Sequence, residues 1–370
     1  MEDNQVDSKK ADFNILMVGG RRTGKTSVLA SFLKGFQDRF AGANITLTPG
    51  NVHTNLILSD KTMELSNVFN KHGTHDKFDP DVDPAPNWER IDYTFTMKIK
   101  GRDKPRYSLR FTDIPGEWFF EPEKHGEWIE KEVQQLFKET NVMIIAIDTP
   151  HLLEGDDSQG SGYGQYHETF NSVNIFTNKI MDQFFIEAEG NASRKMVLFM
   201  PLKCEKYFWE NRQSEITPAV EKGYAKLLKH LDGDQLKNNC QIAIVPVQTM
   251  GNFIFHKFGE DDEGNVIMHS VRPVPIFSLY RFPNKKAHDE GLNPKYCEQP
   301  LAYILTYILK MAQSDLLTIN NNWFIKLLSF FGIIQLAKDR EMQEAIAVVS
   351  GKIEKSPANG FKIVQNPLHF

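Results

Sequence analysis

The stretch Gly19-Gly20-Arg21-Arg22-Thr23-Gly24-Lys25-Thr26 decides the fold, because it matches the phosphate-binding-loop pattern G-x-x-x-x-G-K-[ST]. It follows the apolar run 13–18, which is typical of a buried parallel strand. It precedes residues 27–33, whose apolar side chains recur with helical period. The alternative, a glycine-rich turn that binds nothing, is disfavoured because both the motif and its flanks match. The sequence therefore predicts phosphate binding where a strand feeds a helix.

Each residue type in this loop has an expected role. Glycines let the backbone bend so that successive N–H groups converge on the β-phosphate. Lys25 is expected to reach the β- and γ-phosphate oxygens, and the Thr26 hydroxyl is expected to ligate Mg²⁺. The predicted nucleotide-binding residues of the loop are Gly19, Gly20, Thr23, Gly24, Lys25, Thr26 and Ser27.

Composition narrows the function classes. The 370 residues are 41% hydrophobic and 25% charged, as in ordinary globular proteins. The net charge of −5 means that the chain has no overall excess of positive charge, which argues against dedicated nucleic-acid binding. The three cysteines, Cys204, Cys240 and Cys297, are widely spaced, so no disulfide framework or zinc site is expected. This pattern favours a reducing, cytoplasmic environment.

The termini carry different signals. The polar residues 1–11 are expected to be disordered and contain no signal peptide. Residues 323–336 are apolar almost all round but too short to span a bilayer. Three interpretations of this segment stay open: docking on the chain's own body, an interface for a protein partner, and an interfacial membrane helix.

Strand and helix patterns alternate along the chain. Segments 91–99 and 107–112 predict a β-hairpin, and buried strands are expected at 142–147, 196–200 and 242–246. Helices are expected at 60–72, 123–139 and 218–231. This order predicts an α/β fold of the P-loop NTPase type, with a mostly parallel sheet and helices on both faces.

The pattern also predicts how the domain is organised. A single nucleotide-binding domain is expected over 12–313, with insertions near 41–90, 151–170 and 252–298, followed by a helical extension and tail over 314–370. Within the third insertion, residues 253–273 are expected to form a β-hairpin with an acidic tip at 259–264.

A second signature, Asp113-Ile114-Pro115-Gly116, lies at the carboxyl end of the second hairpin strand. A carboxylate at this place can hold Mg²⁺ through water, and a glycine three residues later can present its N–H to the γ-phosphate. The pattern D-x-x-G is weak alone and gains its value from following a phosphate loop. Asp113 is therefore a predicted metal residue and Gly116 a predicted phosphate contact.

These motifs and the strand order resemble a Ras-like P-loop GTPase of the TRAFAC class, over about residues 12–251. Within that class, the phosphate loop and Pro201-Leu202-Lys203-Cys204-Glu205-Lys206-Tyr207 resemble bacterial double-GTPase-type proteins of conflict and defence gene clusters. The resemblance implies GTP and GDP as ligands with Mg²⁺, a switch function, and a protein effector or activator as partner.

Base recognition departs from the family pattern. Ras-like proteins read guanine with [NT]-K-x-D, and this chain has Leu202-Lys203-Cys204-Glu205. The Lys203 stem is expected to stack on the purine, and Glu205 to accept from guanine N1 and N2. A solvated Lys–Glu pair beyond a strand is the competing interpretation. From its position alone, Thr249 is expected where the family closes the base pocket with a backbone N–H.

The catalytic features are incomplete. The chain has Glu117 where the family often has a glutamine, and a carboxylate at this place repels the γ-phosphate. Arg21 and Arg22 are candidate catalytic arginines within the loop. The switch threonine is expected before Ile91, among Thr46, Thr48, Thr54 and Thr74.

The sequence as a whole predicts a Mg²⁺-dependent GTP-binding switch with slow hydrolysis that acts through a protein partner in a defence system. Two alternatives stay open: an ATPase of the P-loop class, and a pseudo-GTPase scaffold that holds nucleotide statically.

Overall fold

A computed structural model of the chain describes residues 11–40, 45–79, 89–99, 107–116, 118, 127–155, 163–184, 194–233, 236–270, 272–317 and 340–368. Several predicted features lie outside these residues: the N-terminal ten residues, Glu117, parts of the insertions near 41–90 and 151–170, and the apolar segment 323–336.

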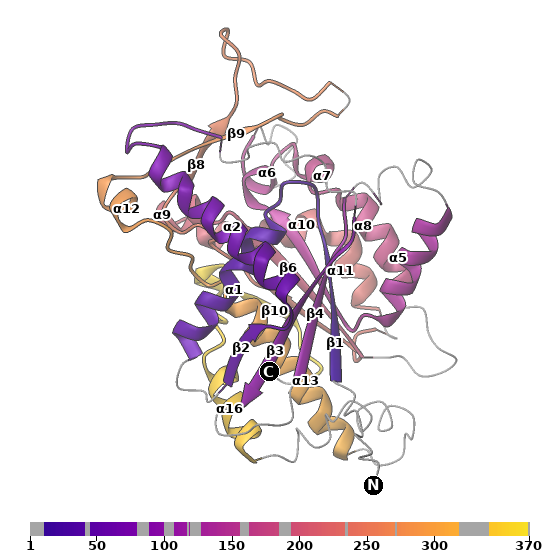
Figure 1. Cartoon of the computed structure of the whole chain (residues 1–370). Helices are drawn as coiled ribbons and strands as arrows, with labels where there is room; N and C mark the ends of the chain where they lie inside the picture. The colour runs from indigo at the N-terminus through magenta and orange to yellow at the C-terminus, as the bar shows by residue number, and fades with distance from the viewer. Residues whose placement is uncertain are drawn as a thin grey trace.

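The core of the described chain is an eight-stranded sheet with the order β10-β7-β6-β5-β1-β4-β3-β2 (Figure 1). Its strands are β1 (Ala11–Val18), β2 (Ile45–Pro49), β3 (Ile91–Ile99), β4 (Tyr107–Asp113), β5 (Val142–Asp148), β6 (Lys195–Leu202), β7 (Cys240–Ile244) and β10 (Lys362–Gln365).

The central five strands of the sheet, β4, β1, β5, β6 and β7, are parallel. The outer strands β3, β2 and β10 are antiparallel to their neighbours. The predicted α/β fold with a mostly parallel sheet is confirmed, and so is the pairing of 91–99 with 107–113. Because parallel strands end at one edge, the residues after β1, β4, β5 and β6 meet there.

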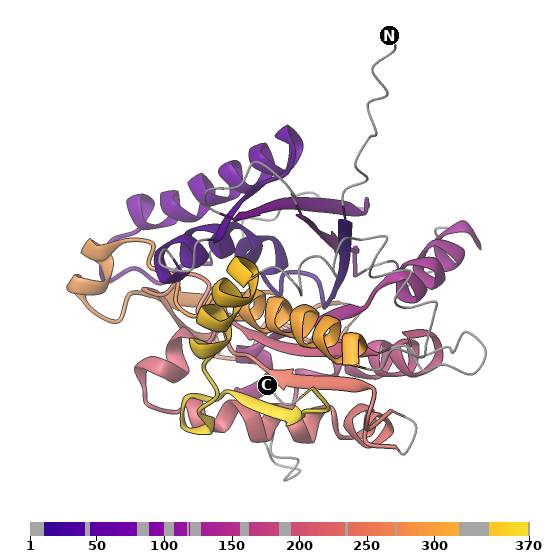
Figure 2. The same cartoon turned by 90° about the horizontal axis from the view of Figure 1, so that it is seen from below.

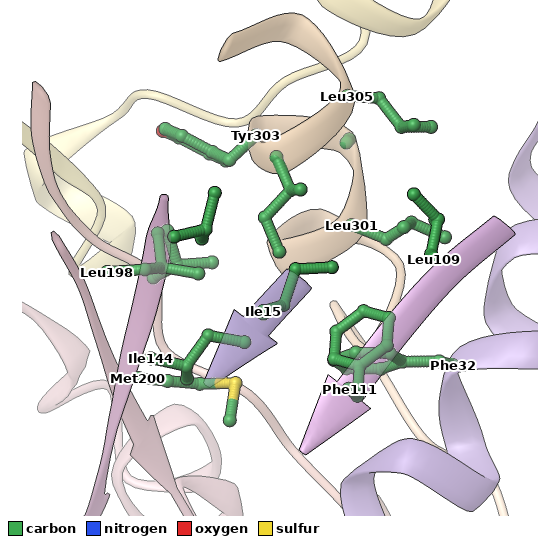
Figure 3. Close-up of a cluster of buried hydrophobic side chains, with 14 of the residues drawn as sticks. Ile15, Phe32, Leu109, Phe111, Ile144, Leu198, Met200, Leu301, Tyr303 and Leu305 are labelled. Atoms are coloured by element: carbon green, nitrogen blue, oxygen red, sulfur yellow. The ribbon is translucent and has the colours of Figure 1, made fainter. Parts of the chain in front are cut away.

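Side-chain alternation along the strands builds two buried layers. On β1, Ile15 and Met17 face one layer, whereas Leu16 and Val18 face the other. Figure 3 shows the first layer, where Leu301 from a C-terminal helix lies among side chains of the strands. Both faces of the sheet are therefore covered, which explains why the central strands read as continuous apolar runs.

The helices divide between these two layers. The first face is covered by α1 (Lys25–Phe40), α13 (Gln299–Leu317) and α16 (Arg340–Gly351), and Figure 2 shows α13 and α16 side by side. The second face is covered by α5 (Glu127–Glu139), α8 (Val173–Lys179), α10 (Ile216–Gly223) and α11 (Ala225–Leu231). The remaining helical elements are α2 (Val52–Lys71), α6 (Thr149–Leu153), α7 (His167–Phe170), η2 (Ile180–Phe184), α9 (Glu205–Trp209), η3 (Gln213–Glu215), α12 (Lys285–Glu290) and η4 (Pro357–Asn359).

The C-terminal part of the chain differs from the predicted helical extension. β10 pairs with β7 and becomes an edge strand of the main sheet (Figure 2). Val349 of α16 is fully buried in the first layer. Residues 340–368 therefore pack as part of the same body as the main sheet and do not form a separate extension.

Two further boundaries differ from the prediction. The expected helix over 218–231 is broken at Tyr224, between α10 and α11, directly after Gly223, where a Cβ would clash with the ring of His167. The inserted hairpin is longer than expected, since β8 (Ile254–Phe258) pairs with β9 (Ser278–Arg281), beyond Pro273. A second, inner pairing joins Glu260 to Val266 near the acidic tip.

Among the helices that the structure describes, none has both the length and the apolar character that a bilayer crossing requires.

We expect Leu301→Ala to lower the free energy of unfolding by about 2–5 kcal/mol, because it leaves a cavity in the first layer. The matched control is Leu56→Ala on α2, whose side chain is 55% exposed and whose loss should cost no more than about 0.5 kcal/mol. Urea unfolding of both variants measures the difference. Equal effects would show that α13 is not part of the core.

Candidate functional site

The phosphate loop wraps around the ammonium group of Lys25. Lys25 Nζ donates to the carbonyl oxygens of Gly19, at 3.2 Å, and Gly20, at 3.4 Å. Two loop residues have positive φ, Arg22 at 62° and Gly24 at 100°. Thr23, which is fully buried, donates its hydroxyl to the Gly20 carbonyl at 3.0 Å. The loop is therefore closed on itself around the lysine that the sequence assigns to phosphate.

Close packing behind the loop requires its first two glycines. A Cβ on Gly19 would lie 2.8 Å from the Ala146 carbonyl oxygen of β5. A Cβ on Gly20 would clash with the carbonyl oxygen of Phe170, at the end of α7. The sequence explains these glycines by loop curvature, and the structure adds a steric reason from segments far along the chain.

The predicted metal residues Thr26 and Asp113 lie on the same side of the sheet as α1. Asp113 Oδ1 is 3.6 Å from Lys25 Nζ and, within the described residues, makes no hydrogen bond despite being buried. Burial raises the pKa of Asp113, and the Lys25 ammonium opposes this rise. A buried carboxylate oxygen without a hydrogen bond, on the same side of the sheet as a threonine in the first turn of α1, fits a Mg²⁺ site.

Tyr93 of β3 is a residue of this site that sequence reasoning missed. Its side chain is fully buried, and its hydroxyl lies close to the Thr26 side chain and to Asp113. Burial and the charge of Asp113 raise the pKa of Tyr93, so the phenol is neutral. The period-two pattern of β3 placed Tyr93 in the core but did not indicate the metal site.

The segment after Asp113 is described only in part. Gly116 is buried, the Trp118 N–H donates to the Pro115 carbonyl at 3.1 Å, and Trp118 packs edge-on against Trp128 at 5.7 Å. Glu117 lies outside the described residues, so its predicted catalytic role stays a prediction.

Two of the four candidate switch threonines are engaged away from the metal residues. The Thr48 hydroxyl lies 3.5 Å from the Thr96 carbonyl, and the Thr54 hydroxyl accepts from the Thr94 N–H at 3.0 Å. Thr46 pairs with Lys98 in β3, seven residues along β3 from Ile91, which pairs with Asp113. Residues 80–90, which lead directly into β3, contain no threonine.

The two predicted base-reading residues lie at the end of β6, next to the phosphate loop. Lys203, with a φ of 60°, donates from Nζ to the Arg22 carbonyl at 2.8 Å. Glu205 is buried, and its Oε1 accepts from the backbone N–H groups of Met250 at 2.7 Å and Gly251 at 3.2 Å. Burial raises the pKa of Glu205, and these hydrogen bonds oppose the rise.

The hydrogen bonds of Glu205 limit its predicted role as an acceptor for guanine. The loop after β7, where the sequence places a base-contacting N–H, already donates two N–H groups to Glu205. Thr249 itself accepts a hydrogen bond from the Ser31 hydroxyl through its carbonyl at 3.3 Å. Lys203, Glu205 and Thr249 are therefore brought together, but one oxygen of the proposed guanine acceptor is occupied by the loop.

Glu205 also lines a cavity of about 620 Å³ between α9, the loop after β7 and α12. Aromatic side chains of Phe208, Trp209 and Tyr296 form part of its wall. Of the described residues, neither Lys203 nor any phosphate-loop residue lines it, so it is not the space in which phosphates would lie.

The two predicted catalytic arginines differ in their surroundings. Arg22 Nη1 donates to the carbonyl of Ile276, in the inserted hairpin, at 3.2 Å. Arg21 is exposed. The Arg22 guanidinium is thus engaged by the hairpin, while the catalytic roles of both residues stay predictions.

A buried polar network lies behind the loop, and the sequence did not predict it. Asp148, which ends β5, lies 2.9 Å from Lys203 Nζ and 2.6 Å from His151 Nδ1. Burial alone would raise the pKa of Asp148, but Lys203 and His151 outweigh it and hold the pKa below its ordinary value. Asn171 accepts from the Asp148 N–H at 2.7 Å.

His167 extends this network toward α10. It is fully buried, lies 2.9 Å from the Asn171 side-chain nitrogen, and packs edge-on against Tyr224. Burial, with a smaller effect from His151, lowers the pKa of His167 to about 3. His167 is therefore neutral at physiological pH.

Comparisons with known proteins add little to this geometry. No protein-family model matches the chain, and no curated protein matches it in sequence. Among solved structures, the GTPase-like domain of S. cerevisiae Ski7 is similar, bound to GTP (12% identity, TM-score 0.36) or to GDP and inorganic phosphate (12%, 0.34). The bacterial dynamin GTPase LeoA from ETEC is also similar (13%, 0.27).

Each of these matches covers 65% of this chain, but only 43% of the Ski7 chains and 30% of the LeoA chain. The chain therefore spans less than half the length of these structures. Likenesses this low carry no argument, and the α/β assignment rests on the sheet order described above.

We expect His167 to make stability sensitive to mild acid. Its folded pKa lies below the unfolded value of about 6.5, so the unfolded state binds the proton first and stability falls as pH drops below that value. When the pH falls from about 7.5 to about 5.5, the free energy of unfolding of the wild-type chain should decrease by about 1 kcal/mol more than that of His167→Gln. Urea unfolding at the two pH values measures this. Parallel losses in both proteins would contradict a buried, neutral His167.

Proposed function

We propose that the chain is a P-loop GTPase that binds GTP and GDP with Mg²⁺ and acts as a nucleotide-dependent switch. The observation that carries the proposal is the phosphate loop in its strand–loop–helix setting, with Lys25 facing the carboxylate of Asp113. On phosphate binding, the Lys25 ammonium would exchange the Gly19 and Gly20 carbonyls for phosphate oxygens.

Thr26 and Asp113 are the residues that would hold Mg²⁺, with Tyr93 beside them. Bound Mg²⁺ would neutralise charge on the phosphates. The chain's own groups suit slow hydrolysis, because Arg22 is engaged by the hairpin and the sequence has Glu117 where the family often has a glutamine. We therefore propose an activating protein partner. A place in a bacterial defence system follows from the sequence resemblance alone.

An ATPase is the second candidate, and one observation favours it. Glu205 Oε1 is used by the loop after β7, so only Oε2 is left to meet the paired donors of guanine. If Glu205 serves only as a cap for this loop, guanine has no dedicated acceptor.

Replacing Lys25 tests the core of the proposal. We expect Lys25→Ala to weaken GTP and GDP affinity at least tenfold, because it removes the cation that compensates the phosphate charge. Thr26→Ala should instead reduce the dependence of GTP affinity on Mg²⁺. Calorimetric titration with and without Mg²⁺ measures both. The control is Lys61→Ala, which removes a lysine paired with Glu64 on α2. An unchanged affinity in Lys25→Ala would refute phosphate binding by this loop.

Replacing Glu205 separates the two nucleotides. We expect Glu205→Gln to weaken the affinity for GTP by about 1–3 kcal/mol and to change the affinity for ATP by less than twofold. The reason is that the amide keeps one acceptor for the loop but presents N–H donors, in place of an acceptor, to the N–H groups of guanine. Competition of GTP and ATP for a fluorescent nucleotide is the measurement. Equal changes for both nucleotides would favour the ATPase or a base-independent site.

A further inference from the structure

Asp148 occupies a central position behind the phosphate loop. Its side chain is 1% exposed and lies between two basic side chains, Lys203 at 2.9 Å and His151 at 2.6 Å. The same carboxylate accepts from the His151 N–H at 3.0 Å and so caps the first turn of α6. The hydrogen bonds fix its orientation, and the low dielectric strengthens its attraction to Lys203.

Lys203 connects Asp148 to the phosphate loop. Besides pairing with Asp148, its ammonium donates to the Arg22 carbonyl at 2.8 Å. Its Cε lies 4.0 Å from the place where a Cβ on Gly24 would be, so its stem runs alongside the loop. Arg22 has a φ of 62°, which is unfavourable for a residue with a Cβ. The Lys203 contact therefore helps to hold a strained residue in the middle of the loop.

The inserted hairpin meets this network at two places. Phe258 of β8 lies 4.8 Å from the His151 ring, which is stacked at 3.5 Å on Phe170. On the other side, the Ile276 carbonyl accepts from Arg22. The contacts form a closed ring that runs from the hairpin through His151, Asp148 and Lys203 to the loop and back to the hairpin.

We infer that Asp148 is a positioning residue for nucleotide binding: it holds Lys203 against the phosphate loop and couples the loop to the β8–β9 hairpin. The inference rests on the proposed function. Without the carboxylate, Lys203 loses its buried counter-charge and its fixed direction, so the loop loses the contact at Arg22. Nucleotide binding and hairpin ordering then become independent.

A double-mutant cycle tests the positioning role. Asp148→Asn keeps an acceptor for the α6 cap but removes the charge that orients Lys203, and Lys203→Met removes the ammonium. We expect each variant to weaken GDP affinity about tenfold, and the double variant to be no weaker than Lys203→Met alone, because Asp148 acts through Lys203. The matched control is Lys195→Met, which removes a buried lysine at the opposite end of β6 and should leave GDP affinity unchanged.

Hydrogen exchange of the nucleotide-free protein tests the coupling to the hairpin. Asp148→Asn should speed exchange of the Ile254–Phe258 amides, and Lys195→Met should not. If Asp148→Asn does not fold, Phe258→Leu tests the ring from the hairpin side and should weaken GDP affinity about threefold.

The outcomes separate this inference from the proposed function. Normal GDP affinity in Asp148→Asn, additive losses in the cycle, or unchanged hairpin exchange would overturn the positioning role while leaving the proposed function intact. Absence of GDP and GTP binding by the wild-type chain would overturn the proposed function, and the exchange measurement would then decide whether Asp148 orders the hairpin.

Discussion

Parallel pairing of β1 with β4 on one side and β5 on the other is the constraint on which the site depends. The register sets Met17 beside both Asp113 and Ile144, so the chain leaves β1 at the edge where β4 and β5 also end. The phosphate loop therefore emerges between Asp113 and Asp148. Lys25, Thr26, Asp113 and Asp148 all lie at or directly after these three strand ends, or in the loop and helix that follow them.

Two lysines hold the loop by the same physical arrangement. Lys25 donates to the Gly19 and Gly20 carbonyls and faces Asp113, whereas Lys203 donates to the Arg22 carbonyl and pairs with Asp148. Their geometry differs in one respect that matters for function. Lys25 is 3.6 Å from its carboxylate and Lys203 is 2.9 Å from its own. The looser pair is the one that a phosphate would replace, and the tighter pair is suited to keep the loop in shape.

The sequence predicted the parts of this site that local patterns encode. The phosphate loop, Asp113 at a strand end and the alternating strands each depend on a few consecutive residues, and these predictions agree with the structure. The sequence analysis named Lys203 but missed Asp148 and the ion pair between them, because this pair joins residues 55 positions apart, which no periodicity reveals. The sequence did not assign Tyr93 to the site, because a tyrosine in an alternating strand is usually a core residue. β10 was not predicted from the sequence, because its four residues are all half-buried and form a strand only by pairing with β7.

Glu205 shows how one methylene group can change the use of a motif. The residue stands where the family has aspartate, and its longer side chain reaches the N–H groups of Met250 and Gly251. A buried carboxylate needs such donors, because burial otherwise penalises its charge. The stabilisation of the loop after β7 and the proposed recognition of guanine would therefore use the same carboxylate. Because Oε1 already accepts two hydrogen bonds from the loop, the proposed base discrimination would depend on Oε2 and on whether the loop can move when a purine binds.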